Sequence, residues 1–214
     1  MPALVLKWLR RLRSNVYGRP VDQLSHSLQT ATLAVCAGAD EDLVVTALCH
    51  DIGKGVSWSG HGKRSADILK PYVSPRAYRI VATHHDFLAI YNVNRSGLDP
   101  YAFRDRHSKK RWYCAAITFA DDWDSIAYDP AAKPIALRYF VPLIRRVFAV
   151  TRRRSSRNTG YELLRRLESV RKRRKRDGDV VEVRRDGTIA IVRAGKSGER
   201  RTAAPSAEKE KKVG

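Results

Sequence analysis

The 214 residues of this chain suffice for one ordinary hydrophobic core and a short appendage, and a hydrophobic content of 43% predicts a folded body. The formal net charge of +20 is unevenly spread, because residues 151–214 hold 21 Lys or Arg against 9 acids. Three widely spaced cysteines without a CxxC pair exclude a disulfide framework and a thiolate zinc site. We find no signal-peptide core and no apolar run near the ~20 residues that span a bilayer, so we expect a cytoplasmic protein.

Residues 1–14 predict a basic amphipathic helix, because apolar side chains recur there at helical spacing between lysines and arginines. Such a helix either packs on the body or docks on a membrane surface, and the sequence leaves both alternatives open. After a turn at residues 17–20, the apolar pattern predicts a helix over 21–37. Asp40 is then placed to cap a second helix that ends near His50.

A short helix is expected to follow Gly60-His61-Gly62 and to end at Leu69, before Pro71. Ser74-Pro75 is a helix start, since a capping residue precedes a proline at the first helical position. Residues 88–108 are polar and irregular, and we expect a loop able to cover a site. Helices over 110–128 and 136–150 complete the body. Strand alternation is lacking, so we predict one all-α domain over residues 15–150.

Residues 151–214 form a basic C-terminal extension in which residues 171–176 are an unbroken cationic run. Beyond it, the alternation on either side of Asp186-Gly187 predicts a β-hairpin over residues 180–192. Residues 203–214 are expected to be disordered. Such an extension binds nucleic acid or an anionic membrane surface nonspecifically, by charge. The alternative is a solvated extension without a partner.

The adjacent pair His50-Asp51 stands at the end of an apolar helical segment, and further potential metal ligands follow along the chain: His26, His61, His84, His85 and Asp124. Neighbouring residues on a helix point about 100° apart, so the pair serves one site best at a helix end, which Gly53 supplies. Imidazole and carboxylate ligands without thiolate suit iron, manganese, cobalt or zinc. These ligands exceed the needs of one ion, so we expect two divalent ions bridged by Asp51.

A lone His, a His-Asp pair, further histidines and a late Asp together resemble the HD superfamily of metal-dependent enzymes. The resemblance covers roughly residues 15–150 and implies an all-α helical bundle around the ligands His26, His50, Asp51, His61, His84 and Asp124. Trp123-Asp124 followed by Asp129-Pro130 looks like a subgroup that contains phosphonate-cleaving diiron oxygenases, with myo-inositol oxygenase a more distant cousin. Asp121 stays an alternative to Asp124, because it follows an Ala as in many members. His85 stays an alternative to His84.

Two departures from the oxygenase pattern bear on the reaction. Those enzymes have a Tyr-Gly-Glu-like element before the first His and a lysine after the last Asp. Here Tyr17-Gly18 is followed by Arg19, and Tyr128 stands at the lysine position. We therefore expect a phosphohydrolase for a small phosphorylated or nucleotide substrate. The alternatives are a mixed-valent diiron oxygenase for an organophosphonate or polyol, and a degenerate HD module whose basic extension is the working part.

The expected catalytic residues are Asp51 and Lys54. Lys54 stands one turn past the dyad and either neutralises a phosphate or is an ordinary solvated lysine. Arg19 is placed to hold an anion, and Tyr17 and His85 are further candidates for binding the substrate.

Overall fold

The computed structural model describes residues 1–56, 58–91, 99–151, 164–165, 180–183 and 189–192. The chain forms two compact units, Met1–Arg171 and Lys172–Gly214. Among its described residues the first unit contains helices and no strand, which confirms the all-α body. In that described part of the chain, no helix has the length and apolar character needed to cross a membrane.

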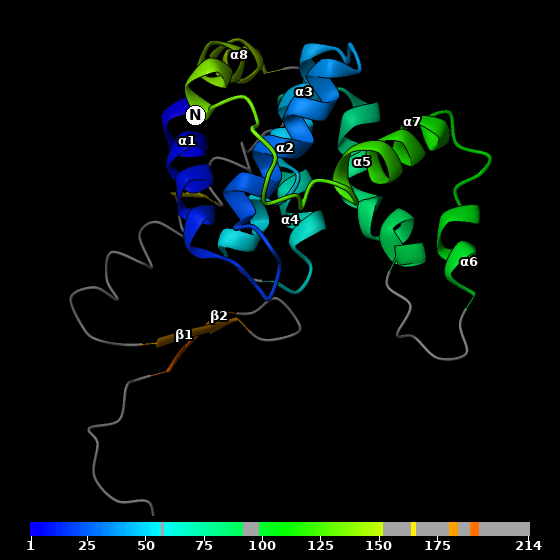
Figure 1. Cartoon of the computed structure of the whole chain (residues 1–214). Helices are drawn as coiled ribbons and strands as arrows, with labels where there is room; N and C mark the ends of the chain where they lie inside the picture. The colour runs from blue at the N-terminus through cyan, green and yellow to red at the C-terminus, as the bar shows by residue number, and fades with distance from the viewer. Residues whose placement is uncertain (57, 92–98, 152–163, 166–179, 184–188, 193–214) are drawn as a thin grey trace, which may run out of the picture. The chain divides into compact units, whose positions relative to one another are not determined.

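The first unit is a helical bundle in which α2 and α3 occupy the middle (Figure 1). Helices α1 (Pro2–Arg11) and α8 (Leu137–Ala149) lie together on one side. The apolar face of α1 is buried in the core through Val5, Trp8 and Leu9, and a short 3-10 turn, η1 (Leu12–Ser14), follows it. The N-terminal helix therefore packs on the body, which was the first of the two alternatives that the sequence left open.

Helices α2 (Gln23–Cys36) and α3 (Glu41–Cys49) begin at capping aspartates, as the sequence predicts for the second of them. Asp22 accepts hydrogen bonds from the backbone N–H groups of Leu24 and Ser25, and Asp40 accepts one from Leu43. Gly38, at φ +69°, reverses the chain between the two helices in a left-handed conformation that glycine adopts without strain. The two helices pack directly against each other and carry three of the expected site residues to one end.

Helices α4 (His61–Leu69) and α5 (Pro75–Leu88) follow a 3-10 turn, η2 (Ile52–Gly55). The Ser74 hydroxyl accepts a hydrogen bond from the Ala77 N–H with Pro75 at the first helical position, so the expected start of α5 is confirmed. Helices α4 and α5 lie close together because Gly62 lacks a side chain. A Cβ atom at that residue would come within 2.8 Å of the His84 ring.

Two expectations are wrong in detail. Residues 88–108 are not one loop, since they contain the turn η3 (Ala89–Tyr91) and helix α6 (Pro100–Asp105). Asp99 caps α6 ahead of Pro100, which is the same start signal as in α5, in a segment too polar to suggest a helix. The helix expected over 110–128 is shorter, with α7 (Tyr113–Thr118) continuing as a π-helical turn, η4 (Phe119–Asp124). Residues 92–98, the middle of the expected loop, lie outside the described residues.

In the second unit, β1 (Val180–Val183) and β2 (Ile189–Val192) pair antiparallel, with Val180 opposite Val192 and Val183 opposite Ile189. The two predicted strands are therefore present as a pair, and residues 184–188 between them lie outside the described residues. The cationic run at 171–176 and the expected disordered end at 203–214 lie outside the described residues. Leu164 is fully buried with the core of the first unit, and the boundary expected at residue 150 stays a prediction.

Candidate metal centre

The His-Asp pair lies where α3 ends. Cys49 is the last helical residue, His50 is the cap, and Asp51 has left helical geometry at φ −104° and ψ 6°. Both side chains are buried, at 0% and 1% exposure, and they face one site. The departure of the backbone from the helix at Asp51 is what allows neighbouring residues to point the same way.

Four histidines share one hydrogen-bonding arrangement, in which the ring Nδ1 faces a backbone carbonyl. The pairs are His26 with Ala127 (3.0 Å), His50 with Ala47 (2.8 Å), His61 with Trp58 (2.6 Å) and His84 with Val81 (2.7 Å). Because a carbonyl only accepts, Nδ1 must carry the hydrogen, and the neutral ring then has its lone pair on Nε2. Such carbonyl partners commonly fix the orientation of metal-ligating histidines.

A first group of ligand atoms is formed by His26 Nε2, His50 Nε2, Asp51 Oδ2 and Asp124 Oδ1. His26 Nε2 lies 3.1 Å from His50 Nε2, 3.5 Å from Asp51 Oδ2 and 3.1 Å from Asp124 Oδ1. His50 Nε2 lies 3.3 Å from Asp51 Oδ2 and 3.4 Å from Asp124 Oδ1. Metal bonds of about 2.1 Å place neighbouring ligand atoms about 3.0 Å apart at right angles and about 3.4 Å apart at tetrahedral angles. The spacing therefore fits a small divalent ion.

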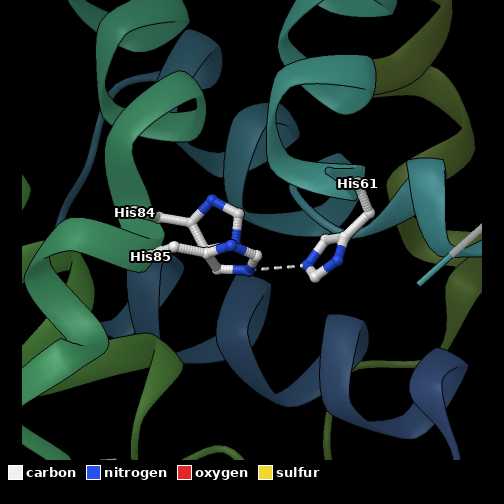
Figure 2. Close-up of side chains that lie close together, drawn as sticks. All are labelled: His61, His84 and His85. Atoms are coloured by element: carbon white, nitrogen blue, oxygen red, sulfur yellow. Dashed lines mark hydrogen bonds between the residues drawn. The ribbon is translucent and has the colours of Figure 1, made fainter. Parts of the chain in front are cut away.

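A second group contains His61 and His84, joined by His85 (Figure 2). His61 Nε2 lies 2.9 Å from His85 Nε2, and Asp51 Oδ1 lies 2.9 Å from His61 Nε2 and 3.9 Å from His84 Nε2. His85 is the exposed member of the three. Asp51 thus directs one oxygen to each group, which is the arrangement of a bridging carboxylate.

Each of the two buried carboxylates has one oxygen without a hydrogen bond from the part of the chain that the structure describes. Asp51 Oδ1 and Asp124 Oδ2 have no hydrogen-bond partner among the described residues. An unsatisfied buried acceptor of this kind costs about 1–3 kcal/mol, so each oxygen calls for a cation. Nitrogen and oxygen atoms that converge in this way are the donor set that a metal ion satisfies once the imidazoles are neutral.

Charges within the cluster shift its pKa values in opposite directions. Burial alone would lower the pKa of His50, but Asp51 and Asp124 outweigh burial and raise it to about 10. Burial would raise the pKa of both carboxyls, yet the neighbouring histidines hold each well below its usual range. Burial and the adjacent His85 lower the pKa of His84. The two carboxylates are therefore ionised at neutral pH, as ligands must be.

The geometry distinguishes Asp124 from Asp121 as the candidate metal ligand. Asp121 forms a hydrogen-bonded ion pair with Arg104 and accepts a hydrogen bond from the Tyr91 hydroxyl at 2.8 Å. Asp124 is 2% exposed and faces His26 and His50. Both residues belong to the π turn η4. Because a π turn is wider than an α-helical turn, the two side chains point in different directions. Asp122 is exposed.

Lys54 is buried rather than solvated, at 5% exposure. Its ammonium donates hydrogen bonds to Asp51 Oδ2 and, at 2.7 Å, to Gln23 Oε1. It also lies 4.7 Å from the centroid of the Trp58 ring. Trp58 in turn contacts Tyr17 at a ring separation of 4.6 Å, and the Tyr17 hydroxyl donates to the Lys54 carbonyl. Lys54 thus connects the Asp51 carboxylate to a half-exposed aromatic pair.

Arg19 and Tyr128 lie next to His26. The Tyr128 ring stacks on the imidazole at 4.1 Å with an interplanar angle of 12°, and the Arg19 guanidinium lies 5.0 Å from the Tyr128 centroid. Burial and the two buried carboxylates raise the pKa of Tyr128, so the phenol is neutral.

Sequence reasoning missed Gln23 and Trp58 as site residues. Each precedes an expected ligand by three residues, Gln23 before His26 and Trp58 before His61. For Gln23 that spacing was the available signal, because side chains three apart on a helix share a face. Trp58 lies in a bend before α4, where helical spacing does not apply.

The family described as HD domain matches residues 24–129, a span that contains all six expected ligands. No curated protein matches the sequence.

Proposed function

Because the chain belongs to the HD-domain superfamily, whose members are generally metal-dependent hydrolases, we propose that it is a metal-dependent phosphohydrolase. Its substrate would be a small phosphorylated molecule or a nucleotide. The observation that carries this proposal is the pair of ligand groups that share Asp51, one oxygen to each. Two divalent ions, of iron, manganese, cobalt or zinc, suit these nitrogen and oxygen ligands.

We assign the ligands by group. His26, His50, Asp51 and Asp124 would hold one ion, and His61, His84 and Asp51 would hold the other, with His85 beside it. Two such ions, when bound, acidify a water molecule and neutralise charge on a phosphoryl group. The carbonyl contacts at Nδ1 keep the imidazoles oriented, so the ligand geometry exists before binding.

Lys54 would bind the phosphoryl group directly. Its ammonium is held by Asp51 and Gln23, which leaves one of its three N–H donors for a substrate oxygen. Burial keeps water from competing for that donor, and a charge-assisted hydrogen bond is roughly twice as strong as a neutral one. Lys54 would therefore position the substrate and stabilise negative charge on the transferred group.

The remainder of the substrate would lie against the residues that rim the site. Tyr17 and Trp58 form a half-exposed aromatic pair next to Lys54 and His61, on which a planar ring can stack. Such stacking contributes about 1–3 kcal/mol per base. Arg19, stacked on Tyr128, would contact a second anionic group. The aromatic pair favours a nucleotide over a sugar phosphate.

Phosphate release under strict anaerobiosis tests this function. Metal-free protein is loaded separately with manganese, cobalt, iron and zinc and given a panel of nucleoside monophosphates and sugar phosphates. We expect phosphate release with at least one metal and none with the Asp51→Ala variant. The same ligands would also serve a diiron oxygenase. Turnover that requires dioxygen and consumes it in step with product would replace hydrolysis with oxygenation.

We further propose that the basic extension tethers the protein to polyanions. Residues 151–214 carry a net charge of +12, from 21 Lys or Arg and 9 acids, and dense cationic segments bind phosphate backbones by counterion release. If the protein showed polyanion binding and no turnover, the extension would be the working part and the body a degenerate HD module.

A further inference from the structure

Gln23 combines complete burial with an incomplete set of hydrogen bonds. It is the first residue of α2 and is 0% exposed. Its Oε1 accepts a hydrogen bond from the Lys54 ammonium at 2.7 Å. Its Nε2 is buried and has no hydrogen-bond partner among the described residues. A buried amide donor left in this state costs about as much as a lost hydrogen bond, so it indicates a missing acceptor.

The orientation of the amide is fixed by the chemistry of its partner. An ammonium group has three donors and no acceptor, so the atom of Gln23 that faces Lys54 must be the oxygen. Flipping the amide would bring two donors together. Nε2 therefore points away from Lys54 as a donor. It faces the Tyr128 phenol oxygen, and this interaction counters part of the rise in the pKa of that group, although the contact falls outside hydrogen-bond geometry.

The two buried glutamines of α2 differ in this respect. Gln29 lies on the same helix and is also buried, but both of its amide atoms are satisfied. Its Nε2 donates to the Asp129 carbonyl at 2.7 Å, and its Oε1 accepts from the Asp129 N–H at 3.1 Å. Gln23 instead lies one turn before His26 and between Lys54 and Tyr128, at the edge of the first ligand group.

We propose that Gln23 is a substrate-binding residue whose Nε2 donates to a phosphoryl oxygen of the substrate. Its Oε1 meanwhile holds the Lys54 ammonium toward the same group. An oxyanion is the acceptor that suits this place, because the neighbouring Lys54 already supplies positive charge and a second donor. This inference rests on the proposed phosphohydrolase function, and it adds a neutral donor to the charged residues that the sequence indicates.

The test is the binding of inorganic phosphate to the metal-loaded full-length protein, followed by calorimetry. Gln23→Glu keeps the acceptor for Lys54 and removes the donor, placing a carboxylate against the anion. We expect phosphate affinity to fall about 30-fold or more, since a hydrogen bond to a charged group is lost and a like charge is added. Gln23→Met removes both polar atoms without adding charge, and we expect an intermediate loss. Metal content and the thermal midpoint monitor folding in each variant.

Gln29→Glu is the matched control, because it buries an acid on the same helix away from the substrate. It should lower thermal stability and leave phosphate affinity unchanged. Wild-type affinity in both Gln23 variants would overturn the inference and leave Gln23 as a support for Lys54 alone. Phosphate binding that depends on Gln23 in a protein that hydrolyses no ester would overturn the proposed function and keep the anion-binding role. Failure of the wild-type protein to bind phosphate at all would overturn both.

Discussion

Gly62→Ala should weaken one metal-binding group while sparing the other. The added Cβ atom would lie 2.8 Å from His84 Cε1 and 3.1 Å from His84 Nδ1. Carbon atoms in contact prefer about 3.5–4.0 Å, so the ring must retreat by roughly 0.7 Å or more. The hydrogen bond from His84 to the Val81 carbonyl is already 2.7 Å long, which restricts the direction of that retreat.

The expected size of the effect follows from two opposing contributions. Replacing a helical glycine by alanine favours the helix by about 1 kcal/mol, and overpacking costs about 1–3 kcal/mol. The free energy of unfolding should therefore fall by about 0–2 kcal/mol. Disturbing the support of a metal ligand typically costs 10–100-fold in metal affinity, and we expect a loss of about that size for the ion at His61 and His84. The ion at His26 and His50 should bind as in the wild type.

Titration of metal-free protein with manganese or cobalt, followed by metal analysis after gel filtration, measures both affinities. Gly38→Ala is the control, because Gly38 has φ +69° with no atom within 4 Å of an added Cβ. That variant should lose about 1 kcal/mol of stability to backbone strain and keep both ions. Unchanged affinity for both ions in Gly62→Ala would refute the reasoning, as would an equal loss of both in a folded protein.

Three further predictions concern the ligands, their protons and the extension. Asp124→Asn should lose the ion at His26, whereas Asp121→Asn should keep full metal content and lose only stability, as metal analysis and urea unfolding would show. Because the pKa of His50 is raised to about 10, this ring is protonated below that pH, and metal binding at pH 8 should release a proton. Calorimetry in two buffers of different ionisation enthalpy would detect that release, and a buffer-independent heat would contradict it. Deleting residues 172–214 should preserve metal binding and weaken salt-sensitive binding to nucleic acid, which filter binding at several salt concentrations would measure.

Local signals made most of the helices predictable. Capping residues such as Asp40 and Ser74 satisfy orphan N–H groups in the first turn, so they mark helix starts without reference to the rest of the fold. The position of His50-Asp51 at a helix end followed from the same reasoning, because neighbouring helical residues diverge. Capping signals alone did not predict α6. Asp99-Pro100 marks its start, but the segment that follows has few apolar residues to bury.

The parts of the site that sequence reasoning missed depend on contacts between distant segments. Gln23 is one polar residue among several on α2 until Lys54, 31 residues later, contacts its amide oxygen. The distinction between Asp121 and Asp124 requires both the π turn and the pairing of Arg104 with Asp121. Neither the wider turn nor that ion pair leaves a periodic signal in the sequence.

The metal content of three purified proteins tests the central claim most directly, that two ions share Asp51. Wild-type protein purified without oxygen and analysed by mass spectrometry should contain two ions per chain. Asp51→Ala should contain none, because it removes a ligand from both groups, and His61→Ala should retain one. A wild-type chain with one fully occupied ion that is unaffected by His61→Ala would contradict the account.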